Sequence, residues 1–312
     1  ESMADAWNNL PDLAPPLING VLRQGHKMLL AGPSKAGKSY ALIELCIAIA
    51  EKQKWLGFPC AQGKIMYVNL ELDRASCLHR FRDVYDAMRL QPKNLANIDV
   101  WNLRGKSIPM DKLAPKLIRR AAKKNYIAII IDPIYKVITG DENSADQMAA
   151  FCNQFDKVCT ELGCAVIYCH HHSKGAQGSK RSMDRASGSG VFARDPDALL
   201  DLIELEPEEP VLKQENQKNN CRLIMDYLNQ HGPDDWEDHI SQDDMCSAYQ
   251  LTSKAKNMLS GPQYNELCQM ITAAEKRILK RTAWRIEGTL REFEKFAPVN
   301  LWFDYPIHVV DE

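Results

Sequence analysis

One stretch of the sequence combines glycines, a lysine and a serine at a spacing suited to holding phosphate groups. A short apolar run ends in Gly32-Pro33-Ser34-Lys35-Ala36-Gly37-Lys38-Ser39, and an apolar-periodic segment over 40–50 follows at once. Strand, glycine-rich loop and helix in this order are the context in which Gly-x-x-x-x-Gly-Lys-Ser forms a phosphate-binding loop. Outside that context the motif would be a chance match in a turn. The context favours a nucleoside triphosphate as the ligand.

Each position of this loop would have a separate task. Gly32 and Gly37 let backbone N–H groups turn inward around the phosphates, and the helix that follows directs the positive end of its dipole at them. Lys38 would reach the β- and γ-phosphate oxygens, and the Ser39 hydroxyl would bind Mg²⁺. The predicted cofactors are therefore ATP and Mg²⁺. The predicted nucleotide-binding residues are Gly32, Pro33, Ser34, Lys35, Ala36, Gly37, Lys38, Ser39 and Tyr40.

An aspartate follows a second apolar run, which covers residues 126–131. Asp132 ends this run and is followed by Pro133. An Asp at the end of an apolar strand is suited to ordering the Mg²⁺ of a bound triphosphate, so Ser39 and Asp132 are the predicted metal residues. Because the next residue is a proline and not a glutamate, the group that activates the attacking water must come from elsewhere.

Glu71 ends another apolar strand, 64–71, and is the candidate for that group. In a doubly wound sheet we expect this strand to lie beside the strand of the phosphate loop, on the edge where such folds bind ligands. A carboxylate there could orient a water molecule for in-line attack on the γ-phosphate. The alternative is a capping or surface acid beside Asp73, but the position at a strand end favours the catalytic role.

Three histidines, His170, His171 and His172, end the strand predicted over 164–169. They could bind zinc or have a purely structural role at the surface. Consecutive residues of an extended segment alternate in direction, however, and do not easily converge on one metal. We favour a second interpretation, in which His170 or His171 lies next to the γ-phosphate and reports hydrolysis to the loop that follows.

Strands and helices alternate along the first two thirds of the chain. The predicted strands are 27–31, 64–71, 98–101, 126–131, 164–169 and 198–205, and the predicted helices are 40–50, a helix capped by Asp73, 111–124, and one that runs from about 144 to 162. Each strand is too apolar to have a wet face. The pattern predicts an α/β fold with a doubly wound, mainly parallel sheet covered by helices on both faces.

The charged run 204–209 interrupts this alternation. Beyond it, 214–230, 242–259 and 263–281 have helical patterns, and 284–293 and 299–310 return to strand character. We expect an ATP-binding core over 1–206, a helical insertion over 207–281, and a C-terminal β-hairpin over 282–312 that rejoins the core sheet.

The composition excludes several classes of protein. The 312 residues include 39 basic and 41 acidic residues, so a nucleic-acid contact would have to be a local basic patch. No apolar run approaches the roughly 20 residues of a membrane span, and the first residues do not have the pattern of a signal peptide. The ten cysteines include no Cys-x-x-Cys pair, which favours free thiols in a reducing cytoplasm.

Taken together, the motifs resemble those of the RecA-like ATPases, and among them those of the plasmid replicative helicase RepA and its mobile-element relatives. The matching motifs are the phosphate loop, Asn69-Leu70-Glu71, Ile130-Ile131-Asp132 and His170-His171-His172-Ser173-Lys174, within about 14–205. The resemblance implies a RecA fold, a ring-like or hexameric homo-oligomer, and ATP hydrolysis at subunit interfaces. By position, it implies that Lys38 and Ser39 hold phosphate and Mg²⁺, Glu71 is the base, Asp132 orders the metal water and His171 is the sensor.

The resemblance also implies an arginine that a neighbouring subunit inserts into the site. Where RepA-like chains carry this residue, this chain has Asp197. Arg194, three residues earlier, and Arg185, just before Ser187-Gly188-Ser189, are the available substitutes. Either arginine could instead be a solvated loop charge.

The segment 173–194 is basic and rich in glycine and serine. It carries Lys174, Lys180, Arg181, Arg185 and Arg194, with Asp184 as its acid before Arg194. In RecA-like proteins the loop after the sensor strand faces the central channel, and cations on such a loop suit sequence-independent contact with phosphates. We expect Lys174, Lys180 and Arg181 to contact single-stranded DNA; the alternative is an ordinary solvated loop.

These observations predict an ATPase that couples hydrolysis to DNA translocation or unwinding, in plasmid or mobile-element replication. A regulatory ATPase switch without motor activity, closer to KaiC, is the alternative. A small-molecule kinase is disfavoured because the sequence has no lid-like arginine cluster and no second substrate motif.

Overall fold

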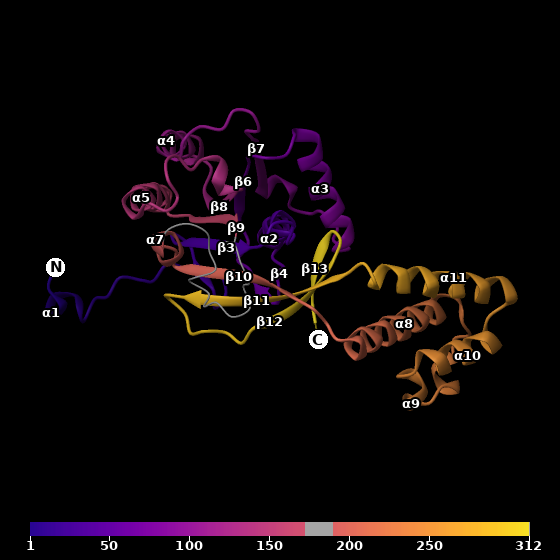
Figure 1. The fold of residues 1–312 in the computed structure, drawn as a ribbon. Helices are drawn as coiled ribbons and strands as arrows, with labels where there is room; N and C mark the ends of the chain where they lie inside the picture. The colour runs from indigo at the N-terminus through magenta and orange to yellow at the C-terminus, as the bar shows by residue number, and fades with distance from the viewer. Residues whose placement is uncertain (172–189, 312) are drawn as a thin grey trace. The chain divides into compact units, whose positions relative to one another are not determined.

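The computed structural model describes residues 1–171 and 190–311. The chain divides into two compact units, which are drawn in Figure 1: residues 1–204 together with 284–312, and residues 205–283. Within the described residues, no helix is both long and apolar enough to cross a membrane. All ten cysteines are free thiols, and eight of them are buried.

The larger unit is built on a sheet of nine strands, counted over the described residues, in the order β13-β12-β11-β10-β3-β9-β8-β6-β7. The strands from β10 to β7 run parallel to their neighbours, and β12 and β13 form an antiparallel hairpin. Their bounds are β3 Lys27–Gly32, β6 Lys64–Asn69, β7 Ile98–Asn102, β8 Tyr126–Asp132, β9 Ala165–His171, β10 Ala198–Leu205, β11 Thr282–Leu290, β12 Val299–Asp304 and β13 Ile307–Val310. The predicted α/β fold with a mainly parallel sheet is confirmed.

Helices cover both faces of this sheet (Figure 1), and each face has its own apolar core. Successive residues of β3 point to opposite faces: Met28 and Leu30 pack with α2, whereas Leu29 and Ala31 pack with α5. The helices are α2 Lys38–Glu51 and α3 Arg74–Ala87 on one face, and α4 Met110–Ala121, α5 Ala145–Leu162 and α7 Gly190–Arg194 on the other. Burial on both faces explains why the strands of the sequence are almost continuously apolar.

Short elements complete the larger unit. They are α1 Met3–Ala6, the strand pairs β1 Pro16–Ile18 with β2 Leu22–Arg23 and β4 Lys54–Trp55 with β5 Phe58–Pro59, and the 3₁₀ turns η1 Leu95–Asn97 and η2 Ile134–Lys136. As the sequence predicts, Asp73 is the N-cap of α3, where its carboxylate accepts the N–H of Ser76 at 2.9 Å.

Parallel strands all end at one edge of the sheet, and the residues predicted to bind or hydrolyse ATP lie at or just after these ends. The phosphate loop follows β3, Glu71 follows β6, and Asp132 and His171 end β8 and β9. The expectation that the strand of Glu71 lies beside the phosphate-loop strand is wrong, because β9 and β8 lie between β3 and β6. Strand order depends on pairing between distant segments, which local patterns do not specify.

The smaller unit is a helical bundle with its own core, which includes Ile224, Leu228, Leu251 and Leu267. Its elements are α8 Glu209–His231, the 3₁₀ turn η3 Trp236–His239, α9 Gln242–Met245, α10 Ala248–Met258 and α11 Gly261–Ile278. The single helix predicted over 242–259 is in fact two helices. Ser247 interrupts it by acting as the N-cap of α10, where its side chain accepts the N–H of Gln250.

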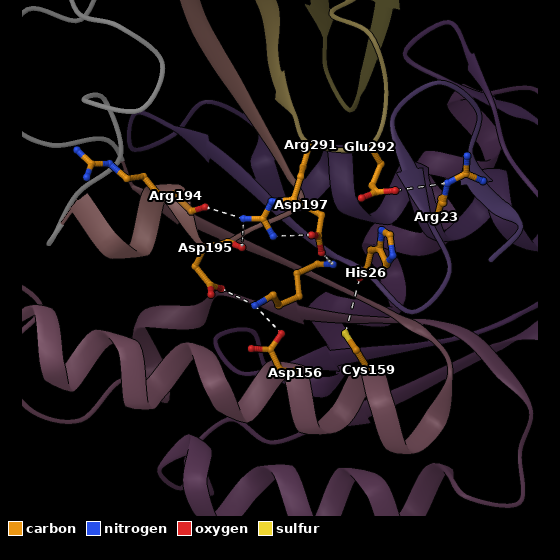
Figure 2. A network of polar contacts seen from close by, with 10 residues as sticks. Arg23, His26, Asp156, Cys159, Arg194, Asp195, Asp197, Arg291 and Glu292 are labelled. Atoms are coloured by element: carbon orange, nitrogen blue, oxygen red, sulfur yellow. Dashed lines mark hydrogen bonds and ion pairs between the residues drawn. The ribbon is translucent and has the colours of Figure 1, made fainter. Parts of the chain in front are cut away.

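A polar network holds the edge of the sheet opposite the phosphate loop (Figure 2). The buried Lys27 ammonium group at the start of β3 lies 2.6 Å from Asp156 of α5 and 2.7 Å from Asp195, which precedes β10. Although burial lowers the pKa of Lys27, its hydrogen bonds to the two carboxylates raise it further, so the net shift is upward. Arg291, just after β11, donates to Asp197 at 2.8 Å and to the carbonyl oxygens of Arg194 and Asp195.

Replacing Lys27 by alanine should destabilise the larger unit, because it leaves two carboxylates facing each other without their cation. We expect a loss of about 2 kcal/mol in urea unfolding, less than for a fully buried pair because Asp156 is half-exposed. Lys124→Ala is the control, since the Lys124 amine lies 3.8 Å from Asp99 in an exposed pair and should cost less than about 0.5 kcal/mol. Equal small losses in the two variants would contradict the assigned role of Lys27.

Candidate nucleotide site

A cavity of about 720 Å³ opens at the carboxyl edge of the sheet, directly over the phosphate loop. Its walls come from four parts of the larger unit: the loop itself, the ends of β6, β8 and β9, helix α3 and the hairpin β12–β13. The residues of the phosphate-loop stretch that line it are Ser34, Lys35, Ala36, Gly37, Lys38, Ser39 and Tyr40. The predicted nucleotide-binding residues beyond Pro33 thus share one cavity wall.

Lys38, at the start of α2, is buried at the base of this cavity. Its ammonium group donates to the carbonyl oxygens of Gly32 at 2.9 Å and Pro33 at 2.7 Å. Burial lowers the pKa of Lys38, while the groups of Cys169, Asp132 and Glu71 act in the opposite direction. A buried cation whose neighbours are carbonyl and carboxylate oxygens is well placed to receive an anionic ligand.

Asp132 ends β8 and is held by both neighbouring strands. The hydroxyl of Tyr67 on β6 donates to Asp132 Oδ2, and the thiol of Cys169 on β9 donates to Oδ1 at 2.9 Å. Asp132 and Ser39 both line the cavity. A carboxylate and a hydroxyl are oxygen donors of the kind that Mg²⁺ prefers, so the two residues fit the predicted metal.

Glu71 lies in the turn after β6 and lines the same cavity. Although two strands separate β6 from β3, Glu71 still faces the phosphate loop because all parallel strands end at one edge. The hydroxyl of Tyr135, in η2, donates to Glu71 Oε1 at 3.3 Å. The ring of Tyr135 also lies 5.8 Å from that of His171, so one residue contacts both the candidate base and the candidate sensor. No motif of the sequence pointed to Tyr135.

The two described histidines of the sensor strand differ in environment. His170 is buried, and burial lowers its pKa to about 4. Its Nε2 lies 3.4 Å from Glu142. His171 is half-buried, and its Nδ1 lies 3.5 Å from the Lys38 amine. His171 therefore contacts the phosphate loop directly. His172 lies outside the described residues, and among those described no three His, Cys, Asp or Glu side chains cluster as a metal site requires.

One end of the cavity is aromatic. Tyr40 of α2 meets Tyr305 edge to face at 5.3 Å between ring centroids, and their hydroxyls are 3.0 Å apart. Phe303 lies 5.8 Å from Tyr40, and the guanidinium carbon of Arg80 lies 4.7 Å from the centre of the Tyr40 ring. Burial and the hydrogen bond to Tyr305 raise the pKa of Tyr40 to about 12. The sequence did not predict three of these cavity residues, Arg80, Phe303 and Tyr305, because no local pattern shows which element folds over the phosphate loop.

The two arginines predicted to act on a neighbouring site have different outcomes. Arg194 is exposed at the end of α7, and Figure 2 shows its guanidinium group pointing away from the Lys27 network. It precedes β10, so it lies at the edge of the sheet opposite the phosphate loop of its own chain. Asp197 accepts hydrogen bonds from Arg291 and from the Lys27 N–H. Arg185 and the predicted DNA contacts Lys174, Lys180 and Arg181 lie outside the described residues.

Comparison with known families identifies the domain that carries this cavity. Residues 2–177 match the family model of the AAA domain, which is more than half of the chain. The chain belongs to the AAA domain family. The matched region of this AAA domain contains the phosphate loop, Glu71, Asp132 and His171.

Two solved structures are similar to this chain, and the first of them shows the same kind of fold. One, a solved ATPase domain, is 13% identical, with a TM-score of 0.51, over 93% of this chain and 86% of that one. The KaiC-like protein PH0186 from the archaeon Pyrococcus horikoshii OT3 is 12% identical, with a TM-score of 0.49, over 95% and 94% of the two chains. The AAA domain of this chain has a RecA-like fold, as the motifs predict; the specific resemblance to RepA stays a prediction.

Replacing Lys38 by alanine should abolish tight binding of ATP, because it removes the buried cation of the cavity. We expect the dissociation constant for Mg-ATP, measured by calorimetry, to rise about a hundredfold or more. Lys54→Ala is the control. It removes an exposed lysine just beyond the C-terminal end of α2 and should change the dissociation constant for Mg-ATP less than about twofold. Equal affinities in Lys38→Ala and the wild type would show that the phosphates bind elsewhere.

Proposed function

We propose that the chain hydrolyses ATP and couples hydrolysis to movement along or unwinding of DNA, as part of a homo-oligomeric, ring-like or hexameric assembly in plasmid or mobile-element replication. The observation that carries the hydrolytic part is the convergence of Lys38, Asp132, Glu71 and His171 on one cavity from four separate segments. A site that only bound nucleotide would not need a carboxylate opposite the phosphate loop.

In this proposal each group of cavity residues has a separate role in the reaction. Lys38 and the N–H groups at the start of α2 bind the phosphates, and the aromatic end of the cavity receives the nucleoside. Mg²⁺, when bound by Ser39 and Asp132, would neutralise charge on the phosphate oxygens. Glu71 orients the attacking water and accepts its proton, and His171, through its contact with Lys38, senses the presence of the γ-phosphate.

Replacing Glu71 by glutamine tests the hydrolytic role. The amide keeps the size of the side chain but cannot accept the proton, so ATP affinity should stay within about threefold while the steady-state rate of phosphate release falls about a hundredfold or more. Asp73→Asn is the matched control, because this acid two residues away is exposed and caps α3. It should keep the wild-type rate. Normal turnover in Glu71→Gln would remove Glu71 as the base.

The proposal that the ATPase acts on DNA rests on the sequence of 173–194, where cations alternate with glycine and serine. Such contacts would depend on phosphate charge and not on base sequence. They would therefore weaken steeply with salt. A ring of subunits would bring several copies of this segment to one strand.

Measuring ATP turnover with and without single-stranded DNA, alongside the mass in solution, tests this part. We expect DNA to raise the rate several-fold at low salt, and the double variant Lys180→Ala/Arg181→Ala to lose this stimulation. The matched control, Lys123→Ala/Lys124→Ala, removes two exposed lysines that follow α4 and should keep it. Turnover indifferent to DNA, together with nucleotide-dependent assembly, would favour the regulatory switch over the motor.

A further inference from the structure

A buried ionisable pair joins the helix of the phosphate loop to the last strand of the sheet. Glu44, on α2, and His308, on β13, are separated by 264 residues in the sequence. The backbone N–H of His308 donates to Glu44 Oε1 at 3.1 Å, and the ring Nδ1 lies 2.7 Å from the same oxygen. The side chains are 0% and 6% exposed for His308 and Glu44, respectively. Because Nδ1 faces a carboxylate oxygen, we assign the ring proton to it.

The same histidine packs directly on the phosphate loop. A Cβ placed on Gly37 would lie 3.1 Å from both Cε1 and Nε2 of His308, and 3.2 Å from the ring of Phe303. The Phe303 and His308 rings are themselves 4.6 Å apart. Figure 1 shows the hairpin β12–β13 next to α2, in agreement with these contacts. The hairpin can approach the loop this closely because residue 37 has no side chain.

The turn of this hairpin supplies the aromatic end of the cavity. Phe303 and Tyr305 stand on the turn side of the hairpin, five and three residues before His308, and both line the cavity with Tyr40. Tyr305 is 64% exposed, and its ring and hydroxyl contacts are with Tyr40 on α2 and with Phe303 of the same hairpin. Its position over the cavity therefore depends on how the hairpin is held below it.

We propose that the Glu44–His308 pair is a positioning device that fixes the C-terminal hairpin over the phosphate loop, so that the last strands of the chain set how tightly the nucleoside part of ATP is held. The inference rests on the proposed nucleotide-binding function and deepens it. Neither Glu44 nor His308 lines the cavity, so both act through Phe303 and Tyr305.

The chemistry of the pair suits this task. Burying a carboxylate without hydrogen-bond partners is costly. If β13 moved away from α2, Glu44 would lose both donors of His308 and would be such a carboxylate. Burial already raises the pKa of Glu44, and the hydrogen bonds from His308 act against that rise. Two hydrogen bonds to one oxygen also restrict the direction from which β13 can approach α2, which apolar packing alone does not.

Comparing ATP with inorganic tripolyphosphate separates the two halves of the ligand. Tripolyphosphate can use the phosphate loop but has no nucleoside to meet the hairpin. For His308→Ala we expect the preference for ATP over tripolyphosphate, given as the ratio of their dissociation constants, to fall roughly tenfold, while tripolyphosphate affinity stays within about threefold. Glu44→Gln retains an acceptor for His308 and should keep the ratio within about threefold of wild type.

Glu51→Gln is the matched control. Glu51 lies two turns further along the same helix, where its carboxylate accepts hydrogen bonds from Tyr85 and Asn94 outside the cavity. This variant should not change the ratio. An unchanged ratio in a folded His308→Ala variant, or an equal loss of both ligands, would overturn the proposal.

If His308→Ala does not fold, a measurement on the wild-type chain tests whether ATP contacts the hairpin. ATP should slow amide hydrogen exchange over 301–310 about tenfold relative to tripolyphosphate, because only ATP contacts the hairpin turn. Equal protection by the two ligands would contradict the inference. If the wild type binds neither ligand, the proposed nucleotide-binding function itself fails; if it binds both and the ratio does not respond, only the role of the pair fails.

Discussion

The buried ammonium group of Lys38 is the constraint on which the carboxyl edge of the sheet depends. A cation in a protein interior must be compensated by nearby oxygens, and here the carbonyl groups of Gly32 and Pro33 accept its hydrogen bonds. Asp132 and Glu71 add negative charge from two other segments of the chain. Carbonyl oxygens are the weaker compensation, so an anionic ligand that replaced them would gain a charge-assisted contact.

The parallel sheet makes this compensation feasible, because it brings the ends of distant strands to one edge. Asp132 depends on this arrangement most directly. Its strand, β8, lies between β6 and β9, and one residue from each neighbour holds one oxygen of its carboxylate. An acid held from both sides has little freedom to turn away from the cavity. The rigidity of the site thus comes from the pairing of strands that are each too apolar to carry chemistry themselves.

What the sequence could predict was local. The bounds of β10, the N-cap role of Asp73 and the strand-loop-helix of the phosphate loop follow from patterns within a few residues, which the final fold preserves. The order of the strands could not be predicted in this way, and the expected neighbour of β3 was wrong. Glu71 nonetheless lines the cavity, because its placement needs only the common edge of a parallel sheet and not a particular order.

The aromatic end of the cavity shows a different limit of sequence reasoning. Gly37 satisfies two demands at once: its φ of +74° suits a residue without a side chain, and its bare Cα allows the ring of His308 to approach. The motif explains the first demand, since it describes how a loop surrounds phosphate. The second demand comes from a hairpin more than 260 residues away, and it is visible only once Glu44 and His308 are seen to meet. A motif glycine can therefore be required by the fold around a site as strictly as by the ligand within it.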